Sequence, residues 1–314
     1  MMRLLDRGAL LASLPVIGVF VWFVFVREMY PVPESLTKQR ITAHLEIYSD
    51  LSDDELDFQA TFFEQFIDYF QQEYFPFEQP ERLRMYLFAT TEGYRAYGES
   101  RRSFPPDDTG FYSSSENLIL VNRQSGLGTA THELVHHFVD CGFVNEPPLW
   151  ANEGIANFFE KFISHIDEQG KLNISVGYFH PQEFTYTKFA AEYTTLEHLM
   201  NSEDQALQRS LMMFLHKKEL FVPFVKELQA NQLEASATQT LTHVYGADLD
   251  VIEADWKNWV AAQPLDENVT LVGAAFVLNK SDWDIWWKAS SDRLYWDEDE
   301  KIFKVRDPQL IMDE

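Results

Sequence analysis

The stretch that most constrains the fold of this chain is Thr131-His132-Glu133-Leu134-Val135-His136-His137. It lies in an amphipathic segment and is expected to form a helix. Residues four apart on a helix lie one turn above each other, so His132 and His136 can direct their imidazole rings at one metal ion. Glu133 lies beside the first histidine, where its carboxylate can reach a water on that ion instead of the ion itself. The stretch therefore predicts a metal centre.

A third ligand is expected from the segment that follows, Glu146 to Glu160. A catalytic zinc site usually has three protein ligands and leaves the fourth position for water. Pro147 and Pro148 predict the start of a helix that carries Glu153, because proline is tolerated in a first helical turn. Packed against the first helix, this second helix would deliver the Glu153 carboxylate to the ion. Asn157, on the same face, would reach a ring nitrogen of a ligand histidine and fix its orientation.

The composition excludes several other kinds of protein. The 314 residues include 25 Lys and Arg against 50 Asp and Glu, a formal net charge of −25. Because binding to nucleic acid or to an anionic bilayer surface needs clustered positive charge, neither partner is expected. The single cysteine, Cys141, excludes an internal disulfide and a cysteine-rich metal site, so histidines and carboxylates would have to hold a metal. We expect Cys141 to be a small buried apolar residue rather than a redox switch.

The N-terminus predicts a membrane segment. Residues 8–26 form an uncharged stretch of 19 residues, close to the length that crosses a hydrocarbon core of roughly 30 Å. An uncleaved anchor is favoured over a cleaved signal peptide, because the stretch ends in bulky residues without a small-x-small cleavage site. A buried core helix is the third interpretation. Arg3 and Arg7 favour a cytoplasmic N-terminus. Residues 1–30 are thus expected to be a single-pass anchor in the cell (inner) membrane, with the rest periplasmic or extracellular.

The remaining pattern predicts an α+β fold. Residues 41–48, 82–89 and 118–122 have the composition of strands, and the apolar residues of 56–70 recur at helical spacing, as expected for a core-facing helix. From about residue 127 to 260 the chain looks mainly helical. Strands come early and helices late, without an internal repeat, which favours α+β over a doubly wound sheet. We expect one domain over residues 31–262 and a tryptophan-rich tail over 263–314, more consistent with a packed cap than with a partner surface.

The combination of HExxH with P-x-W-x-x-E-G-x-A, here Pro148 to Ala156, resembles the gluzincin zinc metallopeptidases, and particularly their peptidase MA-like group. The resemblance implies a zincin-like fold over residues 31–262, in which a small N-terminal sheet is followed by a mainly helical part. It also implies one zinc ion held by His132, His136 and Glu153, with Glu133 as general base and acid. Weaker similarity covers Gly110-Phe111-Tyr112 and Asn117 to Val121, where the family has a G-x-Y turn and an edge strand along its cleft.

Two departures from the family pattern stand out. Sixteen residues, 137–152, separate the second histidine from Glu153, somewhat fewer than in thermolysin-like and aminopeptidase-like relatives. Asn157 stands where many gluzincins carry Asp, which removes a charge near a ligand histidine. Because of the shorter spacing, we expect this chain to lack elements that shape substrate subsites in those relatives.

The resemblance also suggests a residue to stabilise the oxyanion, since aminopeptidase-like gluzincins use a tyrosine that precedes a later helix. Tyr193 has the best placement, and Tyr186 and His180 are alternatives. The expected function is a membrane-anchored, zinc-dependent peptidase acting on peptide or protein substrates, with the strand near residues 118–121 pairing with an extended substrate. The alternative is a non-catalytic envelope binding or assembly module that keeps the fold.

Overall fold

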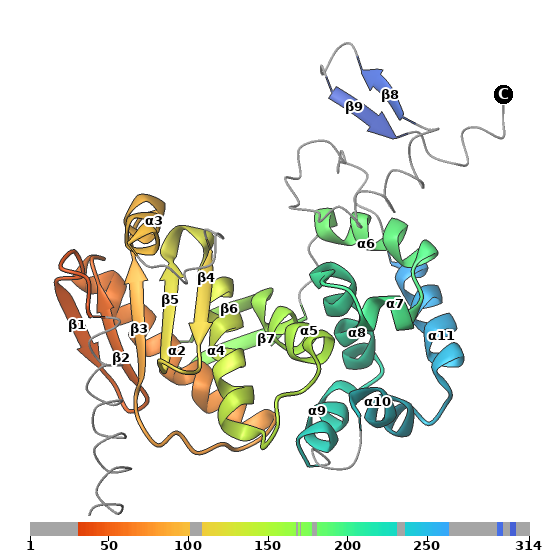
Figure 1. Ribbon diagram of the computed structural model, residues 1–314, viewed down its shortest axis with the longest axis horizontal. Coiled ribbons are helices and arrows are strands. Elements are labelled where there is room, and N and C mark those ends of the chain that lie inside the picture. The colour runs from red at the N-terminus through yellow and green to blue at the C-terminus, as the bar shows by residue number, and fades with distance from the viewer. Residues whose placement is uncertain are drawn as a thin grey trace, which may run out of the picture. The chain divides into compact units, whose positions relative to one another are not determined.

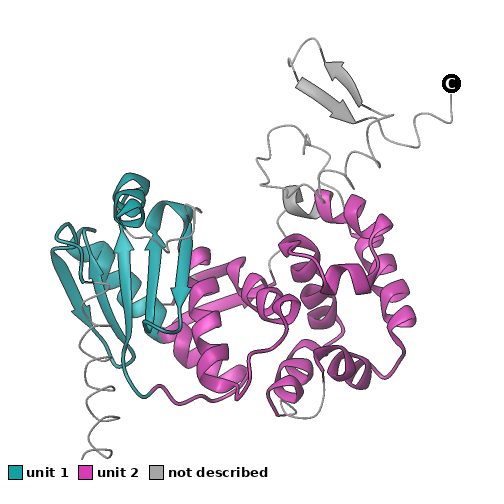
Figure 2. Ribbon diagram, in the orientation of Figure 1, with its two compact units in different colours: residues 1–64, 80–126 teal, residues 65–79, 127–314 magenta. Residues whose placement is uncertain are grey.

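A computed structural model of the protein describes residues 31–100, 109–167, 169, 171–177, 181–230 and 236–263, and the backbone of 294–297 and 302–305. Strands dominate the first part and helices the second, which confirms the predicted α+β class (Figure 1). The chain divides into two compact units, residues 1–64 with 80–126 and residues 65–79 with 127–314 (Figure 2). The anchor expected at residues 8–26 lies outside the described residues. Within the described part of the chain, every helix is too short or too polar to cross a bilayer.

Unit 1 is built on a five-stranded mixed sheet with the strand order β1-β2-β3-β5-β4. The two central pairings, β2 with β3 and β3 with β5, are parallel, and the two outer pairings are antiparallel. Its elements are β1 (Lys38–Ile41), β2 (Leu45–Ser49), the first part of α2 (Asp53–Glu73), β3 (Leu83–Phe88), α3 (Thr91–Glu99), β4 (Gly110–Ser113), β5 (Leu118–Asn122) and a 3₁₀ turn (Arg123–Ser125).

The central strands carry buried residues on both faces of the sheet, as expected for parallel strands. One face packs against α3 through an aromatic cluster, in which the ring of Phe88 lies 5.8 Å from that of Tyr94 and 5.6 Å from that of Tyr97. The opposite face carries Ile47, Met85 and Ile119, which are fully buried and stand in register with one another. The sequence-based strands at 82–89 and 118–122 are therefore confirmed as β3 and β5.

The strand predicted at residues 41–48 is confirmed only for residues 45–48, which belong to β2, because the chain turns back on itself at residues 42–44. Thr42 donates its backbone N–H to the carbonyl oxygen of Leu45 at 2.9 Å, which closes a turn between β1 and β2. Glu64 of α2 holds the turn: its carboxylate accepts the backbone N–H of His44 at 2.9 Å and contacts the imidazole Nδ1 at 2.8 Å. These contacts join residues twenty positions apart, so the local alternation of apolar and polar residues could not indicate them.

The edge of the sheet also differs from the expectation. The segment at residues 118–122 lies between β3 and β4 rather than at the edge, and the edge strand is β4. Gly110-Phe111-Tyr112, expected to be a turn, belongs to this strand and pairs antiparallel with residues 119–121 of β5. The four residues of β4 are mostly polar or partly exposed, so their pattern alone gave a weak strand signal.

Unit 2 is mainly helical. It holds the end of α2 and the following elements: α4 (Leu127–Gly142), α5 (Leu149–Glu160), β6 (Phe162–Ile166), β7 (Leu172–Val176), α6 (Pro181–Tyr193), α7 (Leu196–Met200), α8 (Gln205–Lys217), α9 (Phe221–Ala230), α10 (Ala237–Tyr245), α11 (Leu249–Ala262), β8 (Leu294–Asp297) and β9 (Ile302–Val305). Helix α5 packs against both α4 and α8 (Figure 1). The antiparallel hairpin β6–β7 was not anticipated by the largely helical interpretation of residues 127–260.

An aromatic core fixes the helices that carry the candidate site. Phe70 near the end of α2 lies 4.7 Å, centroid to centroid, from Phe138 of α4 and 5.1 Å from Phe159 of α5. Tyr74 adds an edge-to-face contact with Phe159 at 4.9 Å. Such pairs contribute about 0.5–1.5 kcal/mol each beyond the burial of their area. The aromatic stripe predicted for residues 56–70 is thus part of the core.

Candidate metal centre

The HExxH motif lies on a helix, as predicted. Helix α4 begins after Gly126, whose φ of +100° suits glycine because a side chain is strained in that region. The helix contains Thr129, Leu134 and Phe138 among its buried residues. His132 and His136 therefore stand one turn apart on a rigid element of the core.

The second predicted helix is also present. Helix α5 begins at Leu149, and Pro148 precedes it as the N-terminal cap rather than occupying its first turn. Trp150 is 2% exposed and stacks on Phe224 of α9, with the ring centroids 6.1 Å apart, so it anchors the helix by packing. Glu153 lies one turn further along, on a helix fixed by this contact.

The crossing of α4 and α5 is unusually close at the start of α4. A Cβ atom added to Gly128 would lie 2.1 Å from the backbone oxygen of Glu160, so only glycine fits this position. One turn later the Thr131 hydroxyl donates to the carbonyl oxygen of Phe159 at 2.9 Å. These two contacts set the distance between the helices from which the predicted ligands come.

The structure brings the three predicted ligands together. Nε2 of His132 and Nε2 of His136 are 3.0 Å apart. The Glu153 carboxylate lies 3.6 Å from Nε2 of His132 through Oε2, and 3.5 Å from Nε2 of His136 through Oε1. The side chains are partly buried, with 13% of each histidine side chain and 22% of the Glu153 side chain exposed. One ligand atom of each residue could bind the same ion.

These distances fit a single metal ion. Ligand atoms at about 2.0–2.2 Å from a tetrahedrally coordinated zinc lie roughly 3.3 Å from one another. In addition, Oε2 of Glu153 is buried and has no hydrogen-bonding partner among the described residues, which is costly for a carboxylate oxygen unless a cation faces it. Two imidazole nitrogens with a carboxylate are also a donor set that zinc prefers. The group can therefore hold a metal ion.

The electrostatics of the site favour the same conclusion. Burial, with smaller contributions from His136 and Lys161, holds the pKa of His132 well below its usual range, so the imidazole is neutral and its lone pair is available. Burial raises the pKa of Glu153; His136 opposes this effect, and Glu160 and Glu203 add to it. A buried carboxylate beside further negative charge is stabilised by a divalent cation, and metal ligands must be deprotonated.

From the sequence, Asn157 was expected to orient a ligand histidine through its amide. In the structure, Asn152 also makes such a contact, with a ring nitrogen of His136. Nδ1 of His136 lies 3.0 Å from Oδ1 of Asn152, which is 8% exposed. Asn157 is buried beside His132, and its hydrogen bond to that side chain partly opposes the fall of the pKa of His132. Adjacent residues on a helix point about 100° apart, so the contact of Asn152 with His136 depends on how α4 and α5 cross, and the sequence carried no signal for it.

The remaining candidates differ in their surroundings. Glu133 is 8% exposed on α4, next to His132. Tyr193 is the last residue of α6 and is 57% exposed, whereas Tyr186 is buried and its hydroxyl donates to Asp204 at 2.6 Å. His180 lies outside the described residues. The catalytic roles of Glu133 and Tyr193 stay predictions.

Cys141 has the properties of a structural residue. It is partly buried and lies 3.5 Å, Sγ to Nε2, from the buried ring of His137. Burial and the nearby Asp140 raise the pKa of the thiol to about 11. A thiol that stays protonated at neutral pH is a poor nucleophile and redox group.

Comparison with known proteins yields no relative: no family model matches the chain, and no curated protein is significantly similar to it. The functional interpretation therefore rests on the site itself.

Proposed function

We propose that the protein is a zinc-dependent peptidase of the gluzincin type with a zincin-like fold. The observation that carries the proposal is the convergence of His132, His136 and Glu153 from two packed helices, with Glu133 beside the first ligand. The chain supplies three ligands, which is the number used by catalytic zinc sites that keep one position open. The same two helices carry the motifs that resemble gluzincins, so sequence pattern and geometry support one reaction class.

The proposed chemistry is the addition of water to a peptide carbonyl. Zinc, when bound, would lower the pKa of a coordinated water toward about 7 and polarise the carbonyl group of the substrate. The Glu133 carboxylate takes a proton from the water while the oxygen of that water attacks the carbonyl carbon. It then passes the proton to the amine nitrogen as the C–N bond breaks, so one residue acts as base and then as acid.

Tyr193 is the residue that we propose for the oxyanion. A negative charge develops on the carbonyl oxygen during the attack, and a positioned hydroxyl donor stabilises it. The hydroxyl of Tyr186 is already engaged by Asp204, whereas the exposed ring of Tyr193 can meet a substrate. Tyr193 also precedes helix α7, which packs against the helix that carries Glu153.

Metal analysis of the full chain, purified in detergent, tests the proposal. We expect about one zinc ion per chain, together with hydrolysis of unstructured peptides that stops on chelation and returns on addition of zinc. Glu153→Ala removes one of the three ligands. Its zinc affinity should fall by more than the factor of about 10–100 that loss of a residue supporting a ligand costs. Wild-type protein without zinc would refute the metal centre, and zinc without hydrolysis would favour the non-catalytic module.

We also propose that the segment at residues 8–26 tethers this activity to the membrane, with the catalytic part outside the cytoplasm. The support is the uncharged length of the segment and the two arginines before it. After an alkaline wash, which strips peripheral proteins from membranes, the full chain should stay in the membrane pellet, and added protease should reach the catalytic part only from the outer side. Release into the supernatant would contradict the anchor.

A further inference from the structure

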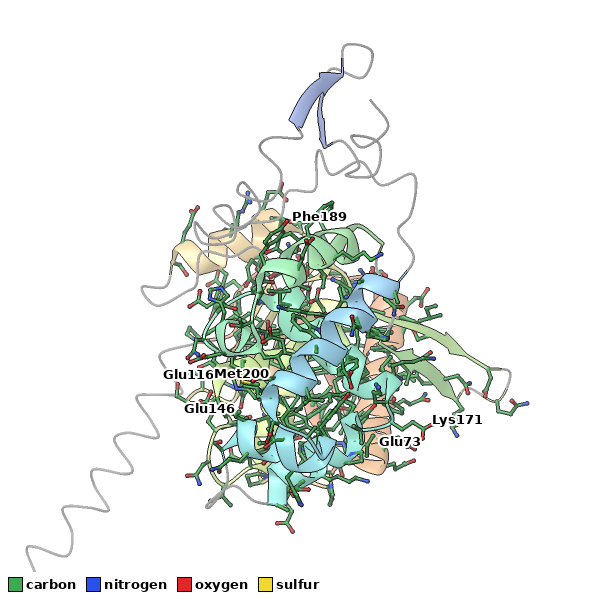
Figure 3. The ribbon with its side chains drawn as sticks, turned by 90° about the vertical axis from the view of Figure 1, so that its right-hand side faces the viewer. Glu73, Glu116, Glu146, Lys171, Phe189 and Met200 are labelled. Atoms are coloured by element: carbon green, nitrogen blue, oxygen red, sulfur yellow. The ribbon has the colours of Figure 1, made fainter. Side chains whose placement is uncertain are left out.

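We infer that Glu146 is a positioning residue: it fixes the amide of Asn152, and through that amide it holds His136 in the form that binds metal. The inference rests on the metal centre proposed above. It assigns a role to a residue that lies seven positions before the ligand Glu153, in the segment between α4 and α5 (Figure 3).

Two contacts connect the three side chains. Nδ2 of Asn152 donates to Oε1 of Glu146 at 3.4 Å, and Oδ1 of Asn152 lies 3.0 Å from Nδ1 of His136. Asn152 is nearly buried, while Glu146 is exposed. The amide of Asn152 therefore stands between an anion at the surface and a candidate metal ligand in the interior.

The chemistry of donors and acceptors gives this chain of contacts a direction. An ionised carboxylate only accepts hydrogen bonds, so the NH₂ group of Asn152 must face Glu146. The amide oxygen then faces His136 and can only accept, so Nδ1 of that imidazole must carry the proton. The proton is thus placed on Nδ1, and the lone pair of Nε2 points toward His132 and Glu153.

Without Glu146, the orientation of the amide is no longer specified. A flipped Asn152 would present its NH₂ group to Nδ1 of His136, and this arrangement favours the tautomer with the proton on Nε2. A proton on Nε2 occupies the lone pair that a metal needs. The proton would have to move to Nδ1 before the metal could bind, and this step would lower the affinity. Specifying the tautomer of a ligand histidine through its second ring nitrogen is a general way to raise metal affinity.

The segment that carries Glu146 is fixed at both ends. At its start, Gln229 of α9 donates to the carbonyl oxygen of Gly142 at 3.0 Å, and the buried ring of Phe143 packs edge-to-face on Phe75 at 5.3 Å. At its end, Pro147 is buried just before α5 begins. Glu146 is therefore held in place by the packing of its neighbours, and replacing its side chain should leave the backbone unchanged.

Zinc affinity of the full chain, measured by competition with a fluorescent chelator, tests the inference without relying on activity. Asn152→Ala should weaken zinc binding by about 10–100-fold. We expect Glu146→Ala to weaken it by about 10-fold, whereas Glu146→Gln, which keeps an acceptor oxygen for Asn152, should stay within about 3-fold of wild type. In the Asn152→Ala background, Glu146→Ala should have no further effect, because the two residues act through one contact.

The controls separate orientation from charge and from folding. Glu192→Ala removes an exposed glutamate of α6 and should leave zinc affinity unchanged. The metal-free Glu146 variants should unfold at the same temperature as metal-free wild type, because the Glu146 side chain is exposed. Unchanged affinity of Glu146→Ala, additive losses in the double variant, or equal losses for Glu146→Ala and Glu146→Gln would each overturn the inference. Failure of wild-type protein to bind zinc would instead refute the metal centre itself, so the two failures are distinguishable.

Discussion

Replacement of Glu133 by glutamine is expected to lower kcat for peptide hydrolysis by about 10³-fold while zinc remains bound. Glutamine has the shape of glutamate but cannot take up the proton that the attacking water must lose. Glu133 is not one of the three converging ligands, so the metal should be held by His132, His136 and Glu153 as before. Loss of activity with retained zinc would thus separate the base from the ligands.

The measurement compares initial rates of hydrolysis and zinc content for both proteins, using quenched fluorescent peptides and a proteome-derived peptide mixture. The matched control is Glu197→Gln, a change at an exposed glutamate of α7 in the same unit, and it should hydrolyse peptides at the wild-type rate. Equal rates for Glu133→Gln and wild type would show that Glu133 is not the base. Loss of zinc from the Glu133→Gln variant would show that the Glu133 carboxylate of the wild-type protein contributes to metal binding.

The sequence was sufficient to find the three candidate ligands, because the signal for each one is local on its helix. His132 and His136 are four residues apart, and Glu153 follows prolines that mark a helix start, so each position could be inferred without knowing the packing. The packing was needed to see that Asn152 contacts Nδ1 of His136, while Asn157 lies beside the other histidine, His132. Which face of α5 meets α4 depends on the crossing of the two helices, and a single helical pattern does not contain that information.

The same reason explains the errors in the sheet. The strand at 118–122 was found from its apolar run, but its place between β3 and β4 depends on pairings across the chain. Residues 41–48 alternate as a strand would, yet a contact from Glu64 stabilises a turn in the middle. The β6–β7 hairpin lies between helices and pairs residues such as Phe162 and Val176, fourteen positions apart. Non-local contacts decided all three cases.

Gly128→Ala is expected to destabilise the protein by about 3 kcal/mol and to weaken zinc binding as well. Alanine is the better helix former by about 1 kcal/mol, so propensity alone would make this change stabilising. The new methyl group, however, would lie 2.1 Å from the backbone oxygen of Glu160, and a backbone atom cannot rotate away as a side chain can. Helices α4 and α5 would have to separate, at a cost typical of severe overpacking.

The separation would reach the metal centre because the same crossing positions its ligands. Thr131 would lose its short contact with the carbonyl oxygen of Phe159, and Glu153 would move away from both histidines. Urea unfolding of the metal-free full chain measures the loss of stability, and chelator competition measures the loss of affinity. The control is Gly93→Ala in α3, where the nearest atom to an added methyl group is the Thr90 hydroxyl oxygen at 3.3 Å; this variant should be within about 1 kcal/mol of wild type. If Gly128→Ala were as stable as the Gly93 variant, the close approach of α4 and α5 would be wrong, and with it the reason that the ligand atoms converge.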